Sequence, residues 1–203
     1  MNPDFGEDTI VSGNWLHRGV AGVVAVLLLA SSLAAQLTKQ QAKRIEAAVP
    51  RKATARPQER RRLLIWNTPF MEKCPHKGYC VPQAQYAMRL LGEKTGAFEA
   101  IVSDDVAMYL PENLKRFDAI LFNNSNGPWI RPTPEDMDKF KGHGGDIDAV
   151  EKLLRESLLD FVRKGGGIVA YHHAVGGNTH WPGFAELLGA AYWGHPWLSL
   201  IHI

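Results

Sequence analysis

The sequence predicts an α/β fold built on a doubly wound parallel sheet, and three observations predict it. Short apolar runs over residues 63–67, 98–103, 117–123 and 167–171 have the length and composition of buried strands. Helical patterns lie between these runs, over residues 82–91 and 148–164. Strands that alternate with helices form parallel sheets with helices on both faces.

The first predicted helix begins at Pro82, because proline suits the first helical turn, and Gly92 or Gly96 can end it. The run at 117–123 is followed by a polar loop with several prolines and a glycine-rich cluster at 142–145. That loop is too long for a simple connection, so we expect it to belong to a binding site.

The second predicted helix is capped by Asp146 or Asp148, and Asp148 with Glu151 resembles a capping box. Its buried face is expected at residues 150, 154, 158 and 161, and Gly165 ends it. The strand at 167–171 is expected to be buried, and a last helix covers residues 182–188. The whole order predicts a flavodoxin-like sheet that is truncated at the C-terminus.

Composition and charge indicate one globular domain without a general affinity for nucleic acid. The chain has 203 residues, of which 45% are hydrophobic and 22% charged, and its net charge is +2. The positive charge is concentrated in residues 36–62, which contain nine Lys or Arg and two Glu. We interpret residues 36–60 as a basic linker, with an arm for nucleic acid or anionic lipid as the alternative.

The N-terminal segment, residues 1–35, has the pattern of a targeting sequence. Residues 20–30 are continuously apolar, short for a membrane span, and followed by small residues that suit a signal-peptide cleavage site. Acidic residues precede this run and basic residues follow it, which favours an uncleaved anchor as the alternative. We expect the protein to be exported, to the periplasm or outside the cell, or membrane-anchored, with membrane contact only through this segment.

The C-terminal end predicts an incomplete domain. The folded domain is predicted over residues 61–197, and no closing strand or helix follows Trp197. Residues 198–203 are interpreted as a non-native tail, because they match the translation of a sequencing-adapter end. Cys74 and Cys80 lie in the first loop, where they can form a disulfide or remain free thiols, and their spacing fits no standard zinc pattern.

Polar side chains follow each predicted strand at the edge where doubly wound sheets bind ligands. They are His76, Asp104, Asp105, Asn123, Asn124, His172 and His173. Taken singly, each has a structural explanation: Asp104 can cap a turn, the asparagines can shape a loop, and His172 can be a core histidine. Because one edge collects all of them, together they predict a site.

The chemistry of this edge fits two kinds of ligand. His172, with His195 as a second candidate, can hold a divalent metal such as zinc. Sugar hydroxyls can instead pair with Asp, Asn and His side chains, with Trp181 as an apolar platform, or Trp129 or Trp193 in its place. The sequence does not determine whether the protein uses a cofactor or which one. His173 is expected to face away from His172, since neighbouring residues at a strand end alternate.

The ordered motifs resemble the ThuA-like family, named for trehalose utilisation, within the class I glutamine amidotransferase-like superfamily. The similar segments are residues 62–66, 117–124, 161–173, 181–182, 188–189 and 195–196. His76 falls where the family often has a loop histidine. The resemblance implies the fold predicted above, a role in carbohydrate metabolism and a small-molecule carbohydrate as partner.

The resemblance also assigns a role to His172. Amidotransferases of the superfamily carry a cysteine on the sharp turn after a glycine-bearing strand, and here residues 171–174 are Tyr-His-His-Ala. Hydrolysis of glutamine through a thiolate is therefore not expected, and His172 is the candidate catalytic residue. Three functions stay open: an enzyme acting on a sugar or oxidised sugar, a non-catalytic sugar-binding module of a larger exported protein and, least favoured, an amidotransferase.

Overall fold

A computed structural model of the chain describes residues 37–68 and 80–194. All of these residues belong to the second of two units into which the chain divides, residues 1–36 and 37–203. The predicted targeting segment, Cys74, His76 and His195 lie outside the described residues. Within residues 37–68 and 80–194, no helix is long and apolar enough to cross a membrane.

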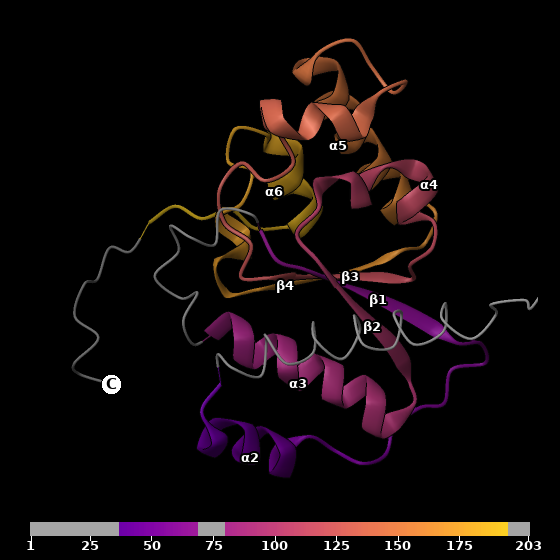
Figure 1. Cartoon of the computed structure of the whole chain (residues 1–203), viewed down its shortest axis with the longest axis vertical. Helices are drawn as coiled ribbons and strands as arrows, with labels where there is room; N and C mark the ends of the chain where they lie inside the picture. Colours follow the sequence, from indigo (N-terminus) through magenta and orange to yellow (C-terminus); the bar gives the residue numbers. More distant parts are fainter. Residues whose placement is uncertain (1–36, 69–79, 195–203) are drawn as a thin grey trace, which may run out of the picture. The chain divides into compact units, whose positions relative to one another are not determined.

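The core of the domain is a four-stranded parallel sheet in the order β2-β1-β3-β4 (Figure 1). Its strands are β1 (Arg61–Trp66), β2 (Phe98–Ser103), β3 (Ala119–Asn123) and β4 (Gly167–Tyr171). In the register, Trp66 pairs with Ser103 of β2 and Phe122 of β3, so these strands end at one edge. The predicted flavodoxin-like α/β fold is confirmed, and the strand order reverses between β1 and β3.

Helices cover both faces of the sheet (Figure 1). On one face lies α3 (Cys80–Thr95), with α2 (Lys39–Ala48) packed against its outer side, and on the other lie α4 (Pro111–Leu114), α5 (Ile147–Arg163) and α6 (Pro182–Leu188). The strands supply a small core on the α3 side, from Leu63, Ile65 and Leu121 with Met88 of α3. The opposite face carries the larger core, which includes Leu64, Ile120, Leu154 and Phe184.

Helix α2 lies within the segment interpreted as a linker. Thr38 caps its start, where its hydroxyl accepts a hydrogen bond from Gln41 N and the Gln41 side chain accepts one from Thr38 N. Tyr86 of α3 donates a hydrogen bond to the Glu46 carboxylate at 2.7 Å, and Lys94 of α3 contacts the Glu46 carbonyl. Residues 36–60 therefore include a helix that packs on the domain.

The start of α5 uses only one of the two predicted caps. Asp146 is the N-cap and accepts a hydrogen bond from Ala149 N at 2.8 Å. Asp148 lies in the first turn and pairs with Arg131 at 2.7 Å. Glu151 is buried, with a role described below. Gly165, with φ 97°, follows the end of the helix as predicted, because glycine adopts this conformation without a steric penalty.

Strand β4 is more exposed than its sequence predicts. Val169 and Tyr171 are 55% and 42% exposed, so the expectation of a buried strand is wrong for them. The reason is position: among the residues that the structure describes, β4 is at the edge of the sheet and pairs with β3 alone. Ile168 packs against the larger core from the other face of the strand.

The long loop after β3 is anchored in the core by aromatic packing. Trp129 and Ile130 are fully buried, and the Trp129 ring lies 5.5 Å from that of Trp66 and 5.1 Å from that of Tyr109. Tyr109 belongs to the 3-10 helix η2 (Val106–Tyr109), and a second 3-10 helix, η3 (Pro134–Phe140), lies within the loop. Aromatic pairs at these distances favour one arrangement of the loop.

Candidate functional site

A cluster of amide side chains joins the ends of β1 and β3, where the strand order reverses. Asn123 Nδ2 donates hydrogen bonds to Asn67 Oδ1 at 2.9 Å and to the Val81 carbonyl at 3.1 Å. Asn67 Nδ2 in turn donates to Gln85 Oε1 of α3 at 2.8 Å. Asn123 Oδ1 is buried and has no hydrogen-bond partner within residues 37–68 and 80–194, and it lies at the edge where such sheets bind ligands.

The loops after these two strands are also held together by hydroxyl groups. Ser125 donates a hydrogen bond to the Trp66 carbonyl at 3.0 Å, and Thr68 donates one to the Asn126 carbonyl at 3.1 Å. Asn123, Asn124 and Ser125 are fully buried. The predicted residues Asn123 and Asn124 therefore belong to an ordered part of the edge.

His172 stands at a sharp turn after β4. It is the first residue of the 3-10 helix η4 (His172–Gly176), and its φ of 55° lies in the left-handed region. That conformation costs a residue with a Cβ about 1–2 kcal/mol. Asn124, directly after β3, has a φ of 57°. The two adjacent strands thus end in strained residues, a feature that concentrates at functional sites.

Asn124 fixes the protonation pattern of His172. Its Oδ1 lies 2.7 Å from His172 Nδ1 and accepts a hydrogen bond from the backbone N–H of His173 at 3.0 Å. The backbone donor identifies the Asn124 atom as oxygen, and an amide oxygen only accepts. His172 Nδ1 therefore carries a proton, and the lone pair of the neutral ring lies on Nε2. His172 is exposed, so it is not a core histidine.

The rings of His172 and His173 lie close together, contrary to expectation. Their centroids are 4.5 Å apart in an edge-to-face arrangement. The predicted alternation fails because the turn begins at His172, so the two residues are not on a strand. His173 also lies near Tyr192, with 6.1 Å between ring centroids. Both histidines therefore belong to the same part of the edge.

Asp104 and Trp181, two other predicted site residues, are not part of the contact between Asn124 and His172. Asp104 is exposed, and its neighbour Asp105 caps η2 by accepting a hydrogen bond from Ala107 N at 3.1 Å. Trp181 is buried in the core, with its ring 5.9 Å from that of Phe184 and the Arg155 guanidinium 5.3 Å from its ring centre. The structure thus gives Trp181 a packing role.

A metal at this edge would need ligands beyond the residues described. Within residues 37–68 and 80–194, no group of three or more His, Cys, Asp or Glu side chains could hold a metal ion. His172 presents Nε2 as one ligand atom, and the predicted partner His195 lies outside the described residues. Cys80, at the start of α3, carries a free thiol.

Comparison with known proteins identifies the family. Residues 62–201 match the ThuA family, described as trehalose utilisation. The chain belongs to the ThuA family. The match begins one residue after the predicted start of the domain and runs into the predicted tail. The resemblance of the motifs is therefore confirmed.

Among solved structures, this ThuA chain is similar to a ThuA-like protein from Bacteroides uniformis, with 23% sequence identity and a TM-score of 0.40. The similarity covers 68% of this chain and 47% of that protein, so the chain spans about half the length of its solved relative. No curated protein matches the chain.

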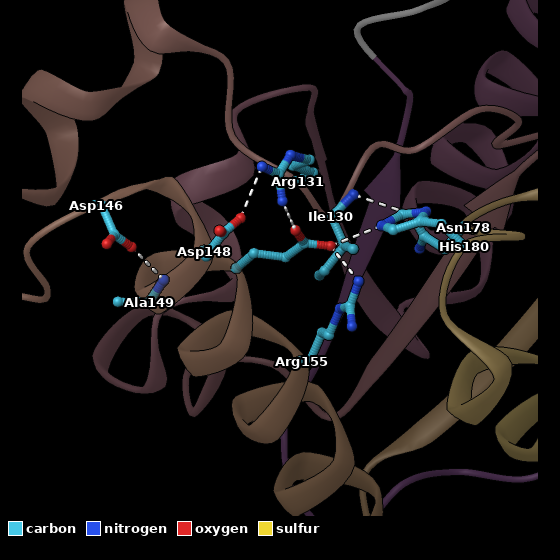
Figure 2. Close-up of polar contacts among 9 residues, drawn as sticks. Ile130, Arg131, Asp146, Asp148, Ala149, Arg155, Asn178 and His180 are labelled. Carbon is cyan, nitrogen blue, oxygen red and sulfur yellow. Dashed lines mark hydrogen bonds and ion pairs between the residues drawn. The ribbon is translucent and has the colours of Figure 1, made fainter.

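The ThuA domain contains a buried ionic cluster that sequence analysis missed. Glu151 of α5 is 3% exposed, and its carboxylate contacts Arg131, Arg155 and His180 (Figure 2). Burial alone would raise the pKa of Glu151, but hydrogen bonds from His180, Arg131 and Arg155 outweigh burial and hold that pKa below its ordinary value. The sequence contained a signal, because Glu151 lies three and seven residues before Leu154 and Leu158 on the buried face.

A second contact joins the loops that follow β3 and β4 in this ThuA domain. Asn178, with φ 49°, accepts a hydrogen bond from Ile130 N at 3.0 Å (Figure 2). It also donates its own backbone N–H to the Gly127 carbonyl at 2.9 Å. Gly177 pairs with Gly127 beside this contact. A Cβ on Gly177 would lie 2.7 Å from the Ser125 carbonyl and from Trp129 Nε1, so only glycine fits.

Proposed function

We propose that the carboxyl edge of this sheet binds and processes a sugar or an oxidised sugar, with Nε2 of His172 as the reactive atom. The observation that carries the proposal is the hydrogen bond between Asn124 and His172, which keeps the proton on Nδ1. Membership of a family described as trehalose utilisation supports a carbohydrate as the ligand. His172 is exposed, which gives a small molecule access to the ring.

The geometry suits general base catalysis. A neutral imidazole with its lone pair on Nε2 can take a proton from a sugar hydroxyl, or from a carbon next to the carbonyl group of an oxidised sugar. The ring then becomes an imidazolium with both nitrogens protonated, and Asn124 Oδ1 continues to accept from Nδ1. The same Nε2 atom could bind a divalent metal such as zinc, with Asn124 as the group that orients the ring.

A non-catalytic sugar-binding module is the alternative, and the amide cluster favours it. Asn67 is half-buried at the end of β1, and its uncharged amide is of the kind that pairs with sugar hydroxyls, while the buried Gln85 and Asn123 hold it in place through hydrogen bonds. An assay for turnover separates the two functions, because a binding module leaves its sugar chemically unchanged. An amidotransferase is less favoured, since the turn after β4 presents His172 while Cys80 lies at the start of α3. Export or anchoring through residues 1–35 stays a prediction.

The test is a titration of the isotope-labelled chain with trehalose, glucose and gluconate, followed by NMR. We expect at least one of these probes to shift the ring resonances of His172 and the side-chain amide of Asn124. His143 is the internal control, because it lies at the α5 end of the long loop, away from Asn124 at its start, and its Nε2 is 3.2 Å from the Glu112 carboxylate of α4; it should not respond. Shifts confined to residues away from the strand ends, or no shift with any probe at millimolar concentration, would contradict the proposal.

A further inference from the structure

We infer that Glu151 is a positioning residue, whose buried carboxylate sets the placement of the two loops that carry Asn124 and His172. The role assigned to those two residues rests on the proposed function. We call Glu151 and its contacts with Arg131, Arg155 and His180 the clamp. Its effect on the placement of the loops can be tested without any ligand. The two loops are residues 124–133, which follow β3, and residues 172–181, which follow β4.

The three partners of Glu151 come from three different segments. Arg131 belongs to the loop after β3, Arg155 is one turn further along α5, and His180 belongs to the loop after β4. His180 Nε2 donates to Glu151 Oε1 at 2.6 Å, and Arg131 also pairs with Asp148 at 2.7 Å (Figure 2). One carboxylate therefore joins both loops to the same helix.

Burying a carboxylate at this position is not an economical way to stabilise a helix. The desolvation cost of a buried ion pair is large, and well-packed apolar side chains commonly stabilise such a position as much or more. Leu154 and Leu158, on the same face of α5, show that apolar residues are accommodated there. The distinctive effect of Glu151 is directional: its hydrogen bonds specify where Arg131 and His180 lie.

The clamp continues without interruption toward the proposed site. Ile130, next to Arg131, donates its N–H to Asn178, which lies two residues before His180. Ser125, Gly127 and Gly177 then bring the two loops into direct backbone contact. Beyond that point lie Asn124 and His172, whose 2.7 Å hydrogen bond requires both loops to be in register. A shift of either loop at Glu151 would therefore lengthen this bond.

The experiment is amide hydrogen exchange by NMR on the full chain carrying E151Q, which keeps the shape of the side chain and removes its charge. The matched control is E156Q on the same helix, since Glu156 is 62% exposed and pairs with Lys152 at 3.9 Å. In E151Q we expect the amides of Ile130, His173 and Asn178 to exchange at least tenfold faster. The strand amides of Leu64 and Ile120 should keep their rates, and E156Q should change none of them.

A second readout separates positioning from general stabilisation. The ring ¹⁵N shifts of His172 report which nitrogen carries the proton, and E151Q should lower the share of the Nδ1–H form that Asn124 maintains. Equal acceleration at the strand and loop amides, or unchanged loop amides and ring shifts, would overturn the inference. If E151Q does not fold, His180→Gln, which keeps a donor in the cluster, is measured in the same way with the same criteria. Neither readout involves a sugar, so a failed sugar titration leaves this result independent.

Discussion

The side-chain oxygen of Asn124 lies 2.7 Å from Nδ1 of His172 and joins two residues that are 48 positions apart in the chain. Each residue directly follows one of two paired strands, β3 and β4, and each adopts a left-handed backbone conformation. The hydrogen bond holds two strained turns together at one edge of the sheet. It also leaves His172 with a defined tautomer and an exposed ring.

The strained backbone at His172 predicts an unusual order of stability among its variants. Glycine adopts a φ of 55° without the Cβ penalty, so His172→Gly should be more stable than His172→Ala by about 1 kcal/mol. At an ordinary position glycine is the less stable of the two. Urea unfolding of both variants measures the difference. An alanine variant as stable as the glycine variant would show that the turn is not strained.

The close approach of the two loops predicts a large effect of one methyl group at Gly177. A Cβ there would meet the Ser125 carbonyl and Trp129 Nε1 at 2.7 Å, so Gly177→Ala should destabilise the domain by about 1–3 kcal/mol. Gly145→Ala is the control, because its Cβ would meet nothing within 4 Å, and its effect should stay within about 0.5 kcal/mol. Similar unfolding free energies for the two variants would contradict the packing described.

Because β4 is exposed, truncating a side chain on β4 should cost less stability than truncating one on its partner strand β3. Val169 is 55% exposed, so Val169→Ala should change the unfolding free energy by no more than about 0.5 kcal/mol. Ile120 of β3 is fully buried, and Ile120→Ala should cost about 2–5 kcal/mol. Both are read from denaturant unfolding. A cost at Val169 comparable with that at Ile120 would show that the face of β4 is covered in solution.

The ionic cluster predicts how stability depends on pH. The folded-state pKa of Glu151 is lowered, so its contribution is present above the ordinary value of 4.5 and is lost as pH falls through the folded-state pKa. The charges that face it are Arg131, Arg155 and His180, with Asp148 beside Arg131. E151Q should therefore lose less stability than the parent chain as the pH falls below about 4.5. Identical slopes in the two proteins would show that Glu151 does not titrate in this way.

Much of the fold is predictable because its signals are local. The strands at 98–103 and 167–171 and the helix at 182–188 have the predicted bounds, since apolar runs, Pro182 and Gly189 mark them within a few residues. The burial of β4 depends on which strand lies beside it, and no local pattern records that. Helix α2 was missed because it has no buried residue, and its contacts are with α3 far along the chain.

The candidate site was predictable where strand order determined it. Asn123, Asn124 and His172 follow β3 and β4, and parallel strands bring their ends to one edge. The roles of Glu151, Gly177 and Asn178 depend on contacts between segments that are distant in sequence. Asp148 and Glu151 matched a capping box in spacing, yet their partner is an arginine from another loop.

The proposed function requires that His172 bind the ligand without supporting the fold. The decisive measurement compares His172→Gly with His143→Ala by calorimetric titration with the sugar that perturbs the NMR spectrum of the parent chain, alongside the melting temperature of each. We predict that His172→Gly loses detectable binding with a melting temperature close to that of the parent chain, and that His143→Ala keeps its affinity. Binding retained in His172→Gly, together with a large fall in melting temperature, would contradict the account and make His172 a structural residue.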